Sequence, residues 1–367
     1  MLSTAELRYV LALTRTPNLG DILVKKLLSK VGSAEGVFKE KSSNLAKIDG
    51  IGQLRLKSIQ AKKQLEEADE EIRFIEKNEI DCYYFQDAHY PDFLKHCIDA
   101  PVLLFGKGNI DLKNKKIISI VGTRKATSYG VGFCENLIAE LAPLNPVIVS
   151  GFAYGIDICA HRAALENGLQ TVSCLAHGRD QIYPKKHEKY YSKILENGGF
   201  LTEFWSSDVF DRTNFLRRNR VIAGLAQATI VIESAERGGS LVTADIANSY
   251  NREVFAVPGR VSDSQSKGCN KLIKHQKAHV LTSAADIIYH LGWELEEKTK
   301  PVQTQLFVEL DEDEKQIFRY LKDKEKELLD SIAIACNMPV FKVATVLMNM
   351  ELKGVIRTLP GKLFELV

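Results

Sequence analysis

Hydroxyl and cationic side chains follow directly after a β-branched apolar run. The run Ile117–Val121 ends at Gly122, and Thr123, Arg124 and Lys125 come next. A glycine lets the backbone turn tightly, and a helix-like segment begins a few residues later. Hydroxyls, cations and the free amides of a helix N-terminus together bind phosphate. We therefore predict a phosphate-binding loop at the carboxyl end of a buried strand, with an ordinary turn and a solvated arginine as the alternative.

A second group of cations lies at residues 212–220, RTNFLRRNR. Four arginines fall within these nine residues, and no acidic residue lies among them. Phe215 stands between the arginines, and an earlier loop carries Tyr183 and Lys185. Cations hold a phosphate backbone and aromatic rings stack on unpaired bases, at about 1–3 kcal/mol per base. This mixture predicts a groove for single-stranded nucleic acid.

The same residues also admit a structural interpretation. Phe215 can be a core residue at a helix start, and Arg217 and Arg220 can pair with Glu233 or Glu203. The sequence alone leaves both interpretations open.

Other polar residues indicate neither catalysis nor a metal. Asp157 and His161 are spaced i, i+4, which favours capping and packing of a helix over acid–base work. Cys269, His275 and His279 do not have the spacing of a usual zinc site. The sequence contains no G-x-G-x-x-G, G-x-x-x-x-G-K-[ST], G-x-S-x-G or H-E-x-x-H motif. We therefore expect no cofactor, no metal and no catalytic residue, and a binding protein rather than an enzyme.

Strand-like and helix-like patterns alternate between Ile117 and about Leu291, and this alternation predicts an α/β fold with a doubly wound parallel sheet. The expected strands are Ile117–Val121, Val147–Ser150, Thr171–Leu175, Phe200–Thr202, Thr229–Ile232, Val254–Val257 and His279–Leu281. Ligands of such sheets bind beyond the carboxyl ends of the strands. Cations that are far apart in the sequence should therefore gather at one rim.

Helical and β-like patterns flank this alternating region. Residues 3–77 read as helices interrupted by glycine turns at 17–20 and 48–52, which resemble helix-hairpin-helix turns. Such turns can present amides to a DNA phosphate, or they can serve a packing or protein-contact domain. The β-like pieces Cys82–Phe85 and Pro101–Gly108 should extend the sheet.

The last part of the chain predicts a separate module. Trp293–Asp313 is charged, contains Pro301 and lacks a sustained period, as a linker does. Three helical patterns follow, and then two β-like pieces, Val355–Thr358 and Leu363–Leu366, around a proline-glycine turn. This order predicts a winged-helix domain. The expected domains are 1–80, 81–292 and 314–367, with 293–313 as the linker.

Composition describes an ordinary globular chain. The 367 residues are 45% hydrophobic and 26% charged, with a net charge of +2, so any cationic site must be a local cluster. No stretch has the length and apolarity of a membrane span. The odd number of scattered cysteines indicates reduced thiols and a cytoplasmic location. They are Cys82, Cys97, Cys134, Cys159, Cys174, Cys269 and Cys336.

Together these loops resemble the DprA (Smf) family of DNA-processing proteins. Residues 122–125 are similar to its G-S-R-x motif with threonine for serine, and residues 150–165 to S-G-x-A-x-G-I-D-x-x-A-H-x-x-A-L. Residues 215–225 resemble F-P-x-R-N-R-I-I-A-G-L, with Leu216 in place of proline. Residues 239–244 and 255–259 resemble G-S-L-x-T-A and F-A-V-P-G.

The resemblance implies an extended Rossmann-like fold between an N-terminal helical (helix-hairpin-helix or SAM-like) domain and the winged helix. It further implies sequence-independent binding of single-stranded DNA, a homodimer through the Rossmann-like domain, and loading of a RecA-type recombinase during natural transformation. Two departures, at Cys269 and at residues 276–278, lie near where the family dimerises. The expected DNA-binding residues are Gly122, Thr123, Arg124, Lys125, Lys185, Arg212, Phe215, Arg218, Asn219, Gly239 and Ser240.

Two other functions remain open at this point. A nucleotide-processing enzyme that hydrolyses nucleoside monophosphates would need Glu203, Glu233 or Asp157 as general acid or base. A duplex-DNA regulator would act through the winged helix, whose recognition helix offers Lys342 and Lys353 as cations.

Overall fold

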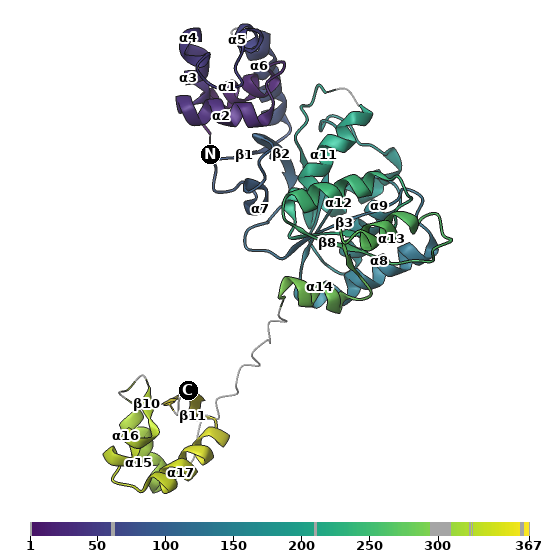
Figure 1. Ribbon diagram of the computed structural model, residues 1–367. Helices are drawn as coiled ribbons and strands as arrows, with labels where there is room; N and C mark the ends of the chain where they lie inside the picture. The colour runs from purple at the N-terminus through teal and green to yellow at the C-terminus, as the bar shows by residue number, and fades with distance from the viewer. Residues whose placement is uncertain are drawn as a thin grey trace. The chain divides into compact units, whose positions relative to one another are not determined.

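The computed structural model forms two compact units, Met1–Leu295 and Glu296–Val367 (Figure 1). Most of the predicted linker lies at residues 294–309, outside the described residues. The structure describes residues 2–59, 63–208, 211–293, 310–322, 324, 326–359 and 363–366.

The first unit is built on one sheet with the strand order β1-β2-β6-β5-β4-β3-β7-β8-β9 in the described residues. The strands from β6 to β9 are parallel to one another, so the predicted α/β class is confirmed. The strands are β1 (Asp81–Tyr84), β2 (Leu103–Gly108), β3 (Ile117–Val121), β4 (Val147–Ser150), β5 (Thr171–Cys174), β6 (Gly198–Thr202), β7 (Ala228–Val231), β8 (Glu253–Ala256) and β9 (His279–Val280).

The predicted extension of the sheet is present, and its two strands run antiparallel to their neighbours. β1 and β2 belong to it as expected, but β1 pairs with β2, and β2 with β6, in antiparallel fashion. The connection from β1 to β2 contains only the short helix α7 (Asp92–Lys95). A parallel crossover usually contains a full helix, and this connection, which is described throughout, has none.

Helices cover both faces of the sheet (Figure 1). Ile117 and Val121 of β3 share one hydrophobic cluster with residues of α11, α12 and α13. Ile118 and Ile120 point to the other face and pack with α8, α9 and α14. Successive strand residues face opposite sides, which is why the strand sequences are apolar throughout. These helices are α8 (Ser128–Leu141), α9 (Ile156–Glu166), α11 (Arg212–Leu225), α12 (Gly239–Ser249), α13 (Lys267–Lys274) and α14 (Ala284–Leu291).

The chain changes direction across the sheet at β3. It proceeds from β3 outward through β4, β5 and β6, and then crosses to β7 on the other side of β3. The loops after β3 and β7 therefore leave in opposite directions and open a crevice between them, where doubly wound proteins bind their ligands.

Six helices precede the sheet in the described residues. Their core also contains Leu103 and Phe105 of β2 and Trp205, so the helices and the sheet share one hydrophobic cluster. A domain boundary at residue 80 stays a prediction. The helices are α1 (Thr4–Arg15), α2 (Asp21–Val31), α3 (Ala34–Lys39), α4 (Ser42–Leu45), α5 (Gln53–Ile59) and α6 (Lys63–Lys77).

The second unit is a winged helix, as predicted. Its helices are α15 (Glu312–Leu321), α16 (Leu329–Ala335) and α17 (Val340–Leu352). The wing strands β11 (Ile356–Leu359) and β12 (Leu363–Leu366) are antiparallel. A third strand, β10 (Glu327–Leu328), pairs with β12 and was missed because two residues show no periodicity. The proline-glycine turn of the predicted hairpin lies outside the described residues.

The helices were also compared with the length and apolarity of a membrane span. Among the described residues no single helix is long and apolar enough to cross a bilayer. The pair α16 and α17 meets the criterion only when taken together, across a bend of 108°.

Candidate nucleic-acid interface

A groove of about 610 Å³ lies at the carboxyl ends of β3, β4 and β7, in the crevice where the chain reverses direction. Nine of the eleven expected DNA-binding residues line it, and they come from three separate segments. They are Gly122, Thr123, Arg124, Arg212, Phe215, Arg218, Asn219, Gly239 and Ser240. The other two, Lys125 and Lys185, are exposed and do not line the groove.

The loop after β3 is fixed by its neighbours. The amide of Thr123 donates to the carbonyl of Glu233 (2.8 Å), and the carbonyl of Thr123 accepts from the amide of Ile156 (3.2 Å). Gly155 has a φ of +80°, and a Cβ there would lie 2.1 Å from the Thr123 carbonyl oxygen. Only glycine fits such a conformation at such a distance. The close approach of the β4–α9 loop thus holds Arg124 at the groove.

An aromatic ring in this groove lies close to two guanidinium groups. The Cζ atom of Arg124 is 5.0 Å from the centre of the Phe215 ring, and that of Arg218 is 5.8 Å from it. Tyr183 contacts the same ring edge to face, with centroids 6.4 Å apart. Phe215 is half-buried, so the alternative of a core residue is not what the structure shows. Cations and rings are available side by side to a strand of nucleic acid.

Arg218 is a buried part of the groove wall. Its guanidinium donates to the carbonyl of Cys174, and its Nε atom donates to Asn219 Oδ1 (3.4 Å). Burial lowers the pKa of Arg218, and the nearby carboxylate of Asp157 opposes this change. Burial also raises the pKa of Asp157, against the effect of Arg218. The charge of each group therefore stabilises the ionised form of the other, beside the groove.

The start of α12 forms the opposite wall. Its N-cap Gly238 has no side-chain cap, so amides of the first turn remain available to an anion. Ser240 is buried and donates to Ser234 Oγ (3.0 Å). Arg237, just before the glycine pair, also lines the groove and was missed. A cation next to a glycine pair before a helix was the signal that could have revealed it.

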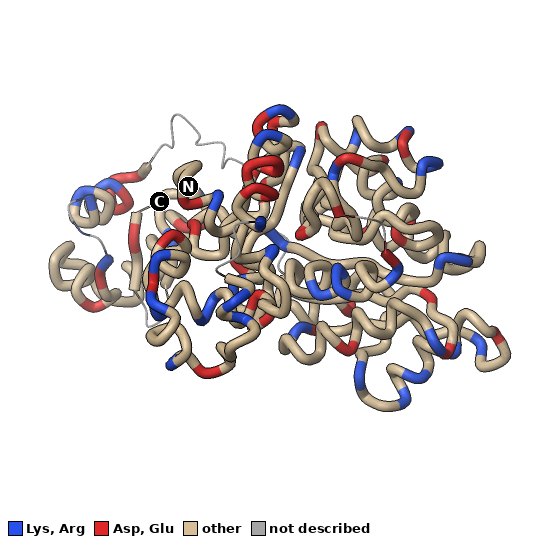
Figure 2. The backbone as a smooth tube through the Cα atoms, turned by 90° about the horizontal axis from the view of Figure 1, so that it is seen from above, with Lys and Arg blue, Asp and Glu red and all other residues tan. Residues whose placement is uncertain are grey.

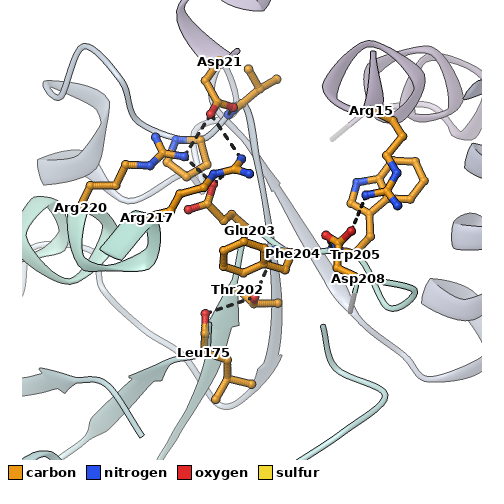
Figure 3. A network of polar contacts seen from close by, with 12 residues as sticks. Arg15, Asp21, Leu175, Thr202, Glu203, Phe204, Trp205, Asp208, Arg217 and Arg220 are labelled. Atoms are coloured by element: carbon orange, nitrogen blue, oxygen red, sulfur yellow. Dashed lines mark hydrogen bonds and ion pairs between the residues drawn. The ribbon is translucent and has the colours of Figure 1, made fainter. Parts of the chain in front are cut away.

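The remaining two arginines of α11 face away from the groove. Both Arg217 and Arg220 form ion pairs with Glu203 and with Asp21 of α2 (Figure 3). The expected pairing with Glu203 is therefore confirmed, and a pairing with Glu233 is wrong. Glu233 instead accepts hydrogen bonds from Thr127 at the start of α8.

His161 has a structural role, as its spacing from Asp157 predicted. It is fully buried between the Thr171 hydroxyl and the Gly151 carbonyl, each 2.6 Å away. A carbonyl only accepts, so Nε2 donates to Gly151, while Nδ1 lies against the Thr171 hydroxyl. Burial lowers the pKa of His161 to about 4. In the described part of the chain no group of histidine, cysteine, aspartate or glutamate residues has the arrangement of a metal site.

The groove is a local cluster rather than one end of a polarised molecule. Figure 2 shows lysine and arginine interspersed with aspartate and glutamate along the whole tube. The net charge of +2 conceals this concentration of arginines.

Fold and groove together define a class: a Rossmann-like protein with a crevice lined by arginines at the switch point of its sheet, joined to a winged helix. The family model of DNA recombination-mediator protein A matches residues 81–292, and that of the DprA winged helix domain matches residues 302–362. The chain belongs to this DprA/Smf family, whose members are DNA-processing recombination mediators.

Individual relatives agree with this assignment. DNA processing protein DprA of Streptococcus pneumoniae is 40% identical over 202 residues, which cover 55% of this chain and 71% of the relative. Protein Smf of Escherichia coli is 34% identical over 276 residues, or 74% of each chain.

Two solved structures are also similar. The X-ray structure of Streptococcus pneumoniae DprA has a TM-score of 0.67 at 32% identity, and the match covers 78% of this chain and 98% of that one. A Helicobacter pylori DprA structure, described for its single-stranded DNA binding mode, has a TM-score of 0.52 at 28% identity. That match covers 58% of this chain and 95% of that one.

Proposed function

We propose that this chain binds single-stranded DNA without sequence preference in the groove at the switch point of its sheet. The observation that carries the proposal is the convergence of Arg124, Arg212, Arg218 and Phe215 on one groove, although they come from different segments. A surface built for one phosphate would not need so many cations. Several phosphates in a row, with bases that stack, match the arrangement.

The groove residues have distinct expected tasks. Arg124 and Arg212 are exposed and would contact phosphates, with the amides at the start of α12 holding a further one. Phe215 would stack on a base, and Asn219 and buried Arg218 would build the wall. Contacts with phosphates and ring faces carry no base code, so sequence preference should be weak.

The same proposal extends to the protein partners of this chain. We propose a homodimer through the Rossmann-like unit and the loading of a RecA-type recombinase onto bound DNA during natural transformation. Family membership supports these two steps. Recombinase assembly on strands coated with single-strand-binding protein, with and without this chain, would test the loading.

A cytoplasmic location belongs to the same proposal. All seven cysteines are free, which supports a reducing compartment.

The acidic residues favour a binding function over catalysis. Glu233 accepts two hydrogen bonds from Thr127, and Glu203 is ion-paired with arginines on the side away from the groove. Asp157 lines the groove, but it faces buried Arg218. The three carboxylates that could serve as general acid or base in hydrolysis are therefore engaged with partners in the protein. Turnover of nucleoside monophosphates that disappears in Glu233→Gln would contradict this part of the proposal.

The recognition helix of the winged helix is poorly suited to bind duplex DNA, because its two lysines are ion-paired. Lys342 pairs with Asp313 (2.7 Å) and Lys353 with Glu314 (2.6 Å), so both cations of its recognition helix are neutralised. Phe341 and Leu352 on the same helix are 77% and 80% exposed. An apolar face suits contact with protein. Deleting residues 296–367 should leave binding of single strands intact.

A titration of labelled oligonucleotides at two salt concentrations tests the central proposal. We expect single strands to bind more tightly than duplex of equal length, with an affinity that falls steeply as salt rises. Arg162→Ala is a matched control, because Arg162 pairs with Glu135 on the helical face of the unit and does not line the groove. Equal affinity for single and double strands would contradict the proposal.

A further inference from the structure

The helices that precede the sheet hold the segment that carries Arg212, Phe215, Arg218 and Asn219 of the groove. This segment follows β6 and includes the first part of α11; its described residues are 203–208 and 211–220, which will be called the β6–α11 segment. Three helices, α1, α2 and α6, each place a charged side chain on it. Figure 3 shows two of these side chains, Arg15 and Asp21.

Two of these contacts fix the loop before α11. Arg15 of α1 forms an ion pair with Asp208, and its Cζ atom lies 5.1 Å from the centre of the Trp205 ring. Glu71 of α6 is buried and accepts hydrogen bonds from the amide (2.9 Å) and hydroxyl (2.6 Å) of Ser206. The part of the loop that follows β6 is therefore held by charge-assisted bonds, which are the stronger kind.

The third contact reaches α11 itself. Asp21 of α2 lies 3.0 Å from Arg220 and 3.9 Å from Arg217 through the same oxygen, Oδ2. Its other oxygen accepts from the amide of Val102 (2.9 Å), just before β2. Both arginines also pair with Glu203, whose side chain is only 2% exposed. Asp21 thus joins the helical part, the sheet and α11 at one point.

Because α11 is one helix, the contact of Asp21 with Arg217 and Arg220 also affects the position of the α11 residues that line the groove. Each helical residue advances by about 100° around the axis, so residues three, four and seven apart share a face. Arg212, Phe215 and Asn219 follow that spacing on the groove side. Arg217 and Arg220 follow it on the other side, where Asp21 holds them. A rotation of α11 that relaxed one face would displace the other.

We propose that Asp21, Arg15 and Glu71 are positioning residues for single-stranded DNA: they set the placement of the β6–α11 segment and thereby aim Arg212 and Phe215 into the groove. This inference rests on the proposed function of the groove. It assigns the N-terminal helices a supporting role in binding, in place of the direct DNA contact that their glycine turns suggested.

The cations at those glycine turns fit this assignment. Arg55 donates to the carbonyls of Asn18 (2.7 Å) and Gly50 (2.6 Å), and so ties the two turns together. Lys26 binds both the carboxylate and the carbonyl of Asp49, each at 2.8 Å. These cations are engaged in holding the turns.

The test compares Asp21→Asn with Asp69→Asn in the full-length chain. Asp69 forms an ion pair of similar kind with Arg8, between α6 and α1, and touches no part of the β6–α11 segment. The probe is a labelled oligothymidylate, titrated at several salt concentrations, with thermal unfolding measured on the same samples. Asp21→Asn should weaken binding at least about tenfold. It should also flatten the salt slope by about 0.7, the value of one lost phosphate contact on a single strand.

The outcomes separate positioning from simple stability. Asp69→Asn should keep the wild-type affinity and slope, and Asp21→Glu should recover most of the affinity. An unchanged affinity and slope in folded Asp21→Asn would overturn the inference. If that variant does not fold, Arg15→Gln takes its place with the same expected loss, and unchanged binding there would overturn it equally. Failure of the wild-type chain to bind the probe would instead overturn the proposed function.

Discussion

The guanidinium of Arg124 lies over the face of the Phe215 ring, 5.0 Å from its centre, although Arg124 belongs to the loop after β3 and Phe215 to α11. Such a cation–π contact contributes about 0.5–1 kcal/mol at an exposed site. It links the loop after β3 to α11 and fixes the orientation of the ring. A base that stacks there meets an oriented surface with a cation beside it.

Replacing Phe215 should separate stacking from charge. We expect Phe215→Ala to weaken binding of single strands by about 1–3 kcal/mol, the usual value of one stacked base, and to leave the salt slope nearly unchanged. Phe215→Tyr, which keeps the ring, should bind almost normally. Fluorescence titration at three salt concentrations measures both quantities. A lower slope in Phe215→Ala would mean that the ring acts mainly by holding Arg124.

Arg124 and Arg212 should behave in the opposite way. Each replacement by alanine removes one expected phosphate contact, so affinity should fall for all sequences and the salt slope should decrease by about 0.7. The measurement is the same titration with oligothymidylate and a mixed sequence. A loss confined to one sequence would contradict the assignment of these arginines to phosphates.

Two glycines allow a test of the loop that holds Arg124. Gly155→Ala would place a Cβ 2.1 Å from the Thr123 carbonyl oxygen at a positive φ, so the β4–α9 loop must move and binding should be lost. Gly132→Ala in α8 meets nothing within 4 Å and should raise stability by about 0.5–1 kcal/mol. Thermal unfolding of both variants measures their stability, and titration with a labelled oligonucleotide measures their binding of single strands. Normal binding by Gly155→Ala would show that the loop is not needed in its observed conformation.

Removing Glu203 should be costly for stability. The carboxylate is buried with Arg217 and Arg220, so Glu203→Leu leaves a buried guanidinium with only Asp21 as its partner. Breaking a buried ion pair in this way costs about 3–5 kcal/mol. Asp245→Asn, at an exposed pair with Lys277, should cost less than about 1 kcal/mol. Urea denaturation of the two variants gives the comparison, and similar small losses would contradict it.

Acid should destabilise the first unit through His161. Burial lowers its pKa to about 4 in the folded chain, against 6.5 for a free histidine. The unfolded chain therefore binds more protons between these values, and stability falls as the pH decreases from about 6.5 to 4. The share from this residue is about 3 kcal/mol, at 1.36 kcal/mol per unit. Denaturant unfolding at several pH values across this range gives the free energy of unfolding of each protein. This free energy should change less with pH in His161→Gln than in the wild type, and an identical pH dependence in the two proteins would refute the expectation.

The sequence by itself determined the strands and the residues that follow them. Buried parallel strands must be apolar on both faces, so β3 and β4 are visible as runs, and glycines and cations after such a run mark a binding loop. Parallel strands end at the same edge, which is why the sequence alone predicts that Arg124, Phe215 and Gly239 share one groove.

Only the tertiary structure decided which cations serve the groove. Arg217 and Arg218 are neighbours in sequence, yet the turn of the helix sends one toward Glu203 and the other toward Asp157. Lys125 and Lys185 lie outside the groove, and Arg237 lies inside it. One of the two partners that Arg217 and Arg220 share, Asp21, comes from α2, far away in the sequence. A side chain's charge is fixed by its type, but its partner depends on elements that meet only when the chain has folded.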